Sequence, residues 1–187
     1  MATFFISDTH FGHDRIIGYC NRPFKDYREM DRAMEENWNA VVGKGDTVWH
    51  LGDFAFGRDA EPWYIRNIAD RLHGHIHLIR GNHDALAENQ LKSRFASISD
   101  YKEITEQGHK IVLFHYGLRT WHHDLRGTWH LYGHSHGGLP PYGKSLDIGV
   151  DDWNFTPVSF AELKSKMDKL QQGKHPAFAK YEPTVKA

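Results

Sequence analysis

The chain has 187 residues, of which 40% are hydrophobic, and its 23 Lys and Arg against 24 Asp and Glu give a formal net charge of −1. This length predicts one domain with a substantial core, and the charge balance excludes a bulk electrostatic attraction to nucleic acid or an anionic membrane, although a local basic groove stays possible. A single cysteine, Cys20, excludes an intramolecular disulfide, and the lack of a signal-peptide pattern or of roughly 18 consecutive apolar residues predicts a cytoplasmic protein without a membrane span.

The N-terminal apolar run, residues 3–6, predicts a strand that stops at Asp8-Thr9-His10. In an extended chain, residues i and i+2 point to the same side, so Asp8 and His10 can reach one common ligand. A carboxylate oxygen beside an imidazole nitrogen suits a divalent metal ion. By itself this pair is a weak signal, and its weight comes from similar strand ends later in the chain.

Residues 11–25 contain Gly, Asn and Pro at short intervals and predict a loop. Asp26 and Glu29 form a capping-box pattern at the start of an amphipathic helix that ends at Gly43. The next predicted elements alternate in type: strand 46–51, helix 59–72, strand 75–79 and helix 85–95. This alternation favours parallel βαβ units.

Connections are shorter in the second half, which favours antiparallel or mixed pairing. We expect a rim strand within 97–107, strands at 110–114, 128–132 and 146–150, a polar aromatic loop at 116–126 and a loop at 137–144. Ser159 and Glu162 predict the start of a last helix. We expect a single domain over residues 1–172 and a loosely ordered tail over 173–187.

Five predicted strands end in residues that can bind metal: Asp8 and His10, Gly52-Asp53, Gly81-Asn82-His83-Asp84, His115, and Gly133-His134-Ser135-His136. In α/β sheets the loops at the carboxyl ends of strands converge on one crevice, so these groups can meet in space. Their two carboxylates, amide and imidazoles exceed what one ion needs and fit two ions that share a carboxylate. Two adjacent divalent ions are a common device for cleaving phosphate esters.

In such a reaction one ion turns a bound water into hydroxide near neutral pH, for in-line attack on phosphorus. We expect His83 to assist at the leaving group by stabilising charge or donating a proton. Asp84, the next residue, is expected to orient the His83 imidazole and keep it protonated.

These blocks, in this order over residues 8–136, resemble the calcineurin-like metallophosphoesterase superfamily. The resemblance implies two ion sites that share one bridging carboxylate: Asp8, His10 and His136 for one, Asn82, His115 and His134 for the other, and Asp53 between them. It also implies an α/β fold, a four-layer α/β/β/α sandwich of two mixed sheets flanked by helices. Residues 21–24, 36–39 and 46–53 are similar to a small bacterial and phage branch that has no cap domain, so we expect a shallow, open pocket.

The resemblance implies a dinuclear metal-dependent phosphoesterase, and within it we favour a phosphodiesterase acting on a small phosphate ester or a nucleotide. The alternatives are a phosphomonoesterase or nucleotide pyrophosphatase and, further away, a nuclease or a non-catalytic scaffold. The ions are expected to be Mn²⁺ or Fe, with Zn²⁺, Ni²⁺ or Co²⁺ as alternatives, since oxygen and nitrogen ligands accept all of them.

Three residues are candidates for contact with substrate. His13 lies just after the first strand, Asn82 can contact substrate as well as metal, and Arg22 could hold a phosphate through its planar guanidinium. The aromatic stretch 116–129 is open to three interpretations: a stacking platform for a nucleobase, a rim packed on itself, or a dimer contact. Asp147, Asp151 and Asp152 are read as turn carboxylates, and His50 as a structural residue.

Overall fold

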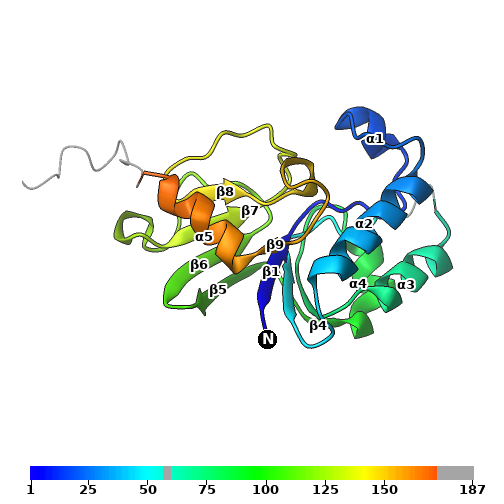
Figure 1. Cartoon of the computed structure of the whole chain (residues 1–187), viewed down its shortest axis with the longest axis horizontal. Coiled ribbons are helices and arrows are strands. Elements are labelled where there is room, and N and C mark those ends of the chain that lie inside the picture. Colours follow the sequence, from blue (N-terminus) through cyan, green and yellow to red (C-terminus); the bar gives the residue numbers. More distant parts are fainter. Residues whose placement is uncertain (57–59, 172–187) are drawn as a thin grey trace, which may run out of the picture.

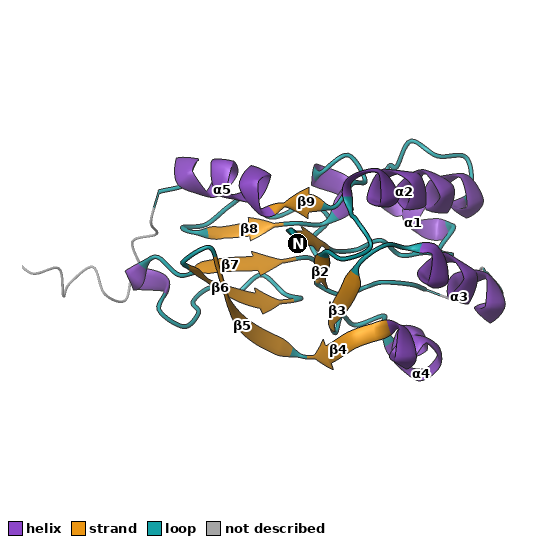
Figure 2. Cartoon of the chain, turned by 60° about the horizontal axis from the view of Figure 1, so that its bottom comes forward, coloured by secondary structure: helices purple, strands orange, loops and turns teal. Residues whose placement is uncertain are grey.

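The computed structural model describes residues 1–56 and 60–171, so the predicted tail lies outside the described residues. Two β-sheets pack against each other (Figures 1 and 2). The larger has the order β4-β3-β2-β1-β9 and the smaller β5-β6-β7-β8. The strands are β1 (Thr3–Ile6), β2 (Thr47–His50), β3 (His75–Ile79), β4 (Phe95–Ser99), β5 (Tyr101–Glu106), β6 (His109–Phe114), β7 (Trp129–Tyr132), β8 (Ser145–Asp147) and β9 (Val158–Ser159).

Both sheets are mixed, and the pairing follows the predicted division of the chain. Strands β1 to β4 are mutually parallel, and β9 adds to β1 in the antiparallel direction. In the smaller sheet β6, β7 and β8 are parallel while β5 pairs antiparallel with β6. Parallel pairing places the carboxyl ends of β1, β2 and β3 at one edge of the larger sheet. In the same way it places the carboxyl ends of β6, β7 and β8 at one edge of the smaller sheet, as a shared ligand site requires.

Five α-helices flank the sheets: α1 (Arg15–Tyr19), α2 (Tyr27–Val41), α3 (Pro62–Arg71), α4 (Ala85–Leu91) and α5 (Phe160–Lys169), within the described ranges. The predicted caps are present at α2 and α5. Asp26 accepts the N–H of Glu29, but the Glu29 carboxylate accepts from Lys25, so only half of the capping box forms. Ser159 and Glu162 form the complete box at α5. None of the helices in these ranges has the length and apolar character of a membrane span.

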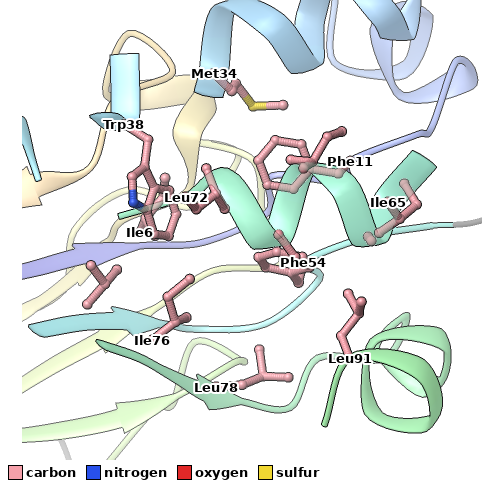
Figure 3. Close-up of a cluster of buried hydrophobic side chains, with 14 of the residues drawn as sticks. Ile6, Phe11, Met34, Trp38, Phe54, Ile65, Leu72, Ile76, Leu78 and Leu91 are labelled. Carbon is pink, nitrogen blue, oxygen red and sulfur yellow. The ribbon is translucent and has the colours of Figure 1, made fainter. Parts of the chain in front are cut away.

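Alternation along β1 divides the core between two layers. Phe4 and Ile6 belong to one cluster, together with Trp38 and Met34 of α2. Figure 3 shows Ile6, Trp38 and Met34 in this cluster. Phe5, on the opposite face, belongs to a second cluster that fills the space between the sheets and includes Leu163 of α5. The predicted α/β class, with two mixed sheets flanked by helices, is confirmed.

Several predicted elements differ from the structure. The expected loop 11–25 contains α1, a five-residue helix that is too short to show a periodic pattern. The expected rim strand 97–107 is two strands, β4 and β5, which lie at the edges of different sheets. The chain changes sheets at Asp100, and continuous β propensity hides that break. Strand β8 ends at Asp147, and β9 was not predicted because only two residues pair.

Candidate metal centre

The strand ends bring the predicted metal ligands into two neighbouring groups. In each group the candidate ligand atoms lie within 4.8 Å of one another: Asp8, His10 and His136 in the first, and Asp53, His115 and His134 in the second. Residues separated by more than 120 positions in the sequence therefore share one site. Each group offers the carboxylate oxygen and imidazole nitrogens that divalent transition metals accept.

The carboxylate of Asp53 lies between the two groups. Its Oδ2 atom is 3.5 Å from Nε2 of His10 and 3.6 Å from Nε2 of His115. Its Oδ1 atom accepts the backbone N–H of His83 at 2.9 Å. The amide oxygen of Asn82 is 3.1 Å from the same Nε2 atom of His115. One carboxylate thus faces imidazoles of both groups, which is the arrangement of a bridging ligand.

The backbone at the site is unusual. Of the ten described non-glycine residues with positive φ, half belong to the two groups: Asp8 (59°), His10 (50°), Asp53 (54°), His134 (66°) and His136 (47°). Side chains other than glycine seldom adopt this left-handed region, and such strain collects where geometry is imposed for function. We take these conformations as independent support for a functional site at the strand ends.

Close approach of two loops explains Gly133. The backbone N–H of His134 donates to both carboxylate oxygens of Asp8, at 3.0 Å each. A Cβ atom on Gly133 would collide with the Asp8 carboxylate and with Oγ of Ser7. Glycine is therefore required by the contact between the loop after β7 and the loop after β1.

The electrostatics of the site favour a cation. Burial is the main cause that raises the pKa of Asp8 to about 8, and the charges of Asp53 and Asp147 add to it, against the opposing effect of His136. Burial also lowers the pKa of His10 well below its ordinary value, followed by the effect of Arg22. Nε2 of His10 is buried and has no hydrogen-bond partner among the described residues. A buried polar atom needs a partner, and a metal ion would supply one to His10 and charge compensation to Asp8.

A buried charged network supports the first group. Nε and Nη2 of Arg22 donate to the two oxygens of Asp151 at 2.8 and 2.9 Å, and Nη2 also donates to the carbonyl of Asp8 at 2.8 Å. Oδ2 of Asp151 is 2.8 Å from Nδ1 of His136, which leaves Nε2 of that ring for a metal. Burial opposes charge on His136, but the hydrogen bond to Asp151 and further contacts raise its pKa to about 10.

This network changes the interpretation of two residues. The Arg22 side chain is 0% exposed and does not line the pocket, so the expectation that it holds a substrate phosphate does not fit its position. Its guanidinium donates its hydrogen bonds to Asp151 and to two backbone carbonyls, and so stabilises the protein itself. Asp151, which the sequence predicts to be a turn carboxylate, lies beside His136, and no local sequence pattern indicates that contact.

The second group is supported mainly by backbone. Nδ1 of His115 donates to the carbonyl of Leu51 at 2.7 Å, which leaves Nε2, beside Oδ1 of Asn82, as the candidate ligand atom. The ring of Tyr116 lies 4.9 Å from that of His115 and 4.8 Å from that of His134. His50 is buried beneath this turn, where its Nδ1 accepts the N–H of Gly52 at 3.2 Å, in keeping with its structural interpretation.

Asp84 has a different place from the one expected. Its carboxylate accepts three backbone N–H groups, from Asp53 at 2.9 Å, Phe54 at 2.8 Å and Gly81 at 2.7 Å. Both oxygens are therefore engaged with backbone and not with the imidazole of His83. Asp84 joins the loop after β2 to the loop after β3, and so positions Asp53. Its effect on His83 is indirect, through the backbone that carries both residues.

A cavity of about 990 Å³ opens above the two groups. His10, Asp53, Asn82, His134 and His136 lie along its floor together with His83, and His13 lines the side. Helix α1 and the residues after it form one wall of this cavity, which keeps an opening to solvent. Other described residues of the lining are Arg15, Ile16, Tyr19, Cys20, Asn21, Phe56 and Ser135.

The aromatic stretch 116–129 does not line this cavity within the described residues. Nε1 of Trp121 donates to the carbonyl of Thr128 at 2.8 Å, and its ring packs 5.4 Å from that of His130. Nε2 of His130 accepts the N–H of Leu118 at 3.1 Å. These contacts correspond to the second interpretation of the stretch, a rim packed on itself.

Comparison with known proteins shows the family. The model of the calcineurin-like phosphoesterase superfamily domain matches residues 1–139. An uncharacterized protein of Methanocaldococcus jannaschii is 33% identical over 173 residues, which is 89% of this chain and 91% of that protein. The gene 66 protein of Mycobacterium phage L5 is 42% identical over 83 residues, 44% of this chain and 39% of the phage protein.

A crystal structure of a protein of unknown function from Aquifex aeolicus is similar in fold, with a TM-score of 0.71 and 28% identity, over 88% of this chain and 98% of that one. The family model matches most of the chain, and the two donor groups at the strand ends agree with that match. The chain belongs to the calcineurin-like phosphoesterase superfamily.

Proposed function

We propose that the protein is a phosphodiesterase that uses two divalent metal ions. The observation that carries the proposal is the position of Asp53 Oδ2, which lies 3.5 Å from His10 and 3.6 Å from His115. A site for a single ion would not require a carboxylate that lies at nearly equal distances from imidazoles of two donor groups. The strained backbone of five candidate ligands supports the same conclusion.

The residues divide into two sets around Asp53. Asp8, His10 and His136 would hold one ion, and Asn82, His115 and His134 the other. When bound, the ions would supply Lewis acidity, a water acidified toward neutral pH and neutralisation of charge on the phosphoryl oxygens. Mn²⁺ or Fe is our proposal for their identity, from the resemblance to the family, and the oxygen and nitrogen donors of these sets accept either ion.

His83 has the position of a proton donor. Its ring lies in the cavity, 5.6 Å from the ring of His10 and 4.8 Å from that of Phe56. The backbone N–H of His83 is held by Asp53, so the imidazole keeps a fixed relation to the bridging carboxylate. A ring nitrogen of His83 can then donate a proton to the ester oxygen that leaves phosphorus.

The cavity favours a diester over a monoester. It is large enough for organic groups on both sides of a phosphate. Of the described residues that line it, Arg15 alone carries an arginine or lysine charge. A dianionic monoester would gain from more cations around the phosphate than the described part of the lining offers, whereas a diester carries one negative charge at the reacting phosphorus.

The test uses chelator-stripped protein to which each metal is returned. The expected substrates are bis(4-nitrophenyl) phosphate and an alkyl phosphodiester, and 4-nitrophenyl phosphate is the monoester comparison. Because nitrophenolate leaves without protonation and an alkoxide does not, His83→Ala should lower kcat by about 100-fold for the alkyl diester and much less for the nitrophenyl diester.

Equal losses on the two diesters would remove His83 from the role of proton donor. Metal-dependent turnover of the monoester alone would establish the phosphomonoesterase alternative. Two bound ions without turnover of either class would contradict the proposal and favour a non-catalytic scaffold.

A further inference from the structure

We infer that the wall formed by α1 selects phosphodiesters whose leaving group carries an aromatic base and a second phosphate, as in a short 5′-phosphorylated nucleotide. This inference rests on the proposed function, because it assigns the leaving group of the same reaction. Three features of the described residues carry it: the size of the cavity, a line of aromatic rings, and the side chains of Arg15 and Tyr19.

The cavity exceeds the needs of a phosphate and two ions. Its volume of about 990 Å³ lies at the upper end of the range for pockets that enclose an entire small molecule. Metal ligands and His83 take up the floor, while α1 and Phe56 contribute the sides. Space beside these walls is available to a group attached to the phosphate.

Aromatic rings lead from the reaction centre to α1. The ring of His83 lies 4.8 Å from that of Phe56, which lies 4.3 Å from that of His13. The ring of His13 is 6.5 Å from that of Tyr19 on α1. Since the line begins at His83, the proposed proton donor, the group that it accommodates is the leaving group. His13 is buried within this line, so the ring that offers a free face is that of Tyr19 at its end. Aromatic surfaces stack on nucleobases with little dependence on base identity, each contact contributing about 1–3 kcal/mol.

Arg15 and Tyr19 lie four residues apart in α1 and both line the cavity, as the helical repeat allows. Tyr19 is 73% exposed, an unusual state for a large aromatic side chain without a ligand. Arg15 is also exposed, and no described residue forms an ion pair with it. Arg22, on the same segment, is by contrast fully buried against Asp151.

An exposed guanidinium beside an aromatic ring matches the phosphate and base of one nucleotide. The balanced reaction is hydrolysis of the dinucleotide pdTpdT. Water adds to the bridging phosphorus, the bond from phosphorus to the 3′ oxygen breaks, and that oxygen takes a proton. Both products are then thymidine 5′-monophosphate. In the unphosphorylated dinucleotide dTpdT the same bond breaks, but the leaving thymidine has no phosphate for Arg15.

The test compares pdTpdT with dTpdT on metal-loaded enzyme. Wild type should show a kcat/KM at least about 10-fold higher for pdTpdT, and Arg15→Gln should abolish this preference by raising KM for pdTpdT alone. Tyr19→Ala should raise KM for both dinucleotides, and Tyr19→Phe should restore it. Arg32→Gln, an exposed arginine of α2 outside the cavity, is the matched control and should change neither substrate.

Equal kcat/KM for the two dinucleotides in wild type, or equal losses on both in Arg15→Gln, would overturn the inference. Metal-dependent turnover of bis(4-nitrophenyl) phosphate without turnover of either dinucleotide would overturn the inference and leave the proposed function standing. If no diester is turned over, the proposed function fails. Calorimetric affinities then test the recognition of the 5′-phosphate by Arg15 separately from turnover: pdTpdT must bind at least about 10-fold tighter than dTpdT, with the difference lost in Arg15→Gln, and equal affinities would overturn that recognition as well.

Discussion

The two donor groups of the candidate metal centre have similar ligands and different supports. The first group depends on charged side chains, since Arg22 and Asp151 form a buried pair that reaches both Asp8 and His136. Arg22 and Asp151 are 129 positions apart in the sequence. The second group depends on backbone, because the carbonyl of Leu51 orients His115. Apart from Asp84, whose carboxylate positions Asp53, side-chain substitutions should therefore disturb the first group far more than the second.

The largest effect is expected where the groups meet. Asp53→Asn removes negative charge from the atom that faces both His10 and His115, so it should lower the occupancy of both ions. A loss of several kcal/mol of charge stabilisation corresponds to a fall in kcat of about 1,000-fold. Metal content and diester hydrolysis at saturating metal measure it. Loss of one ion with the other fully retained would argue against a bridging role.

The substitution Asp151→Asn should affect the two donor groups differently. It weakens the contacts to His136 and Arg22, and outer contacts of this kind contribute about 10–100-fold in metal affinity. We expect one of two ions to bind about 10–100-fold more weakly by calorimetry, while the other keeps its affinity. Arg71→Gln is the matched control, because it breaks a second arginine–carboxylate pair, with Glu35, that lies on the surface. An equal loss of affinity for both ions in Asp151→Asn would contradict the proposed difference in support between the two donor groups.

A smaller effect concerns the packed loop beside the second group. Burial lowers the pKa of His130 to about 4, while its Nε2 accepts the N–H of Leu118. Between pH 6.5 and 4 the unfolded chain binds more protons at this residue, so its contribution to stability is present above pH 6.5 and is lost as the pH falls toward 4. In His130→Gln the free energy of unfolding should fall less steeply in this range, by up to about 1.4 kcal/mol per pH unit.

Chemical denaturation at several pH values measures this slope. The exposed imidazole of His75 supplies the control, since His75→Gln should keep the slope of the wild type. An unchanged slope in His130→Gln would show that His130 does not stay neutral in the folded protein.

The smallest effect is expected at Tyr116. Its ring packs on His115 and His134, but the orientation of His115 comes from the carbonyl of Leu51. Tyr116→Leu should therefore change the affinity of the second ion by less than about threefold, which is roughly 0.6 kcal/mol. A loss as large as that in Asp151→Asn would mean that side chains support both groups alike, and calorimetry on the two variants compares them directly.

The same difference explains what the sequence could predict. Ligands at the ends of apolar runs were predictable because β patterns and short motifs are local, and so were α2, α5 and their caps. The support of the first group was not, because the contact of Arg22 with Asp151 exists only after the segment that follows β8 comes to lie beside the N-terminal loops. The role of Asp84 differs from the expected one for a related reason: its neighbour in sequence is His83, but two of its three backbone partners are amides 30 and 31 residues away.

The wall that α1 forms could not be predicted from the sequence, for a different reason. Helix α1 has five residues, and a periodic apolar pattern needs two or more turns to be seen. Glycine and asparagine around it predicted only a loop. The absence of a cap domain then suggested a shallow pocket, although a short helix is sufficient to bound one side of it.

The central claim is that two ions share Asp53, and anomalous diffraction from crystals of the Mn²⁺-loaded protein tests it most directly. The account predicts two peaks about 3.5–4 Å apart with the Asp53 carboxylate between them. One peak should contact Asp8, His10 and His136, and the other Asn82, His115 and His134. A single peak, or two peaks that have no common contact with Asp53, would contradict the account.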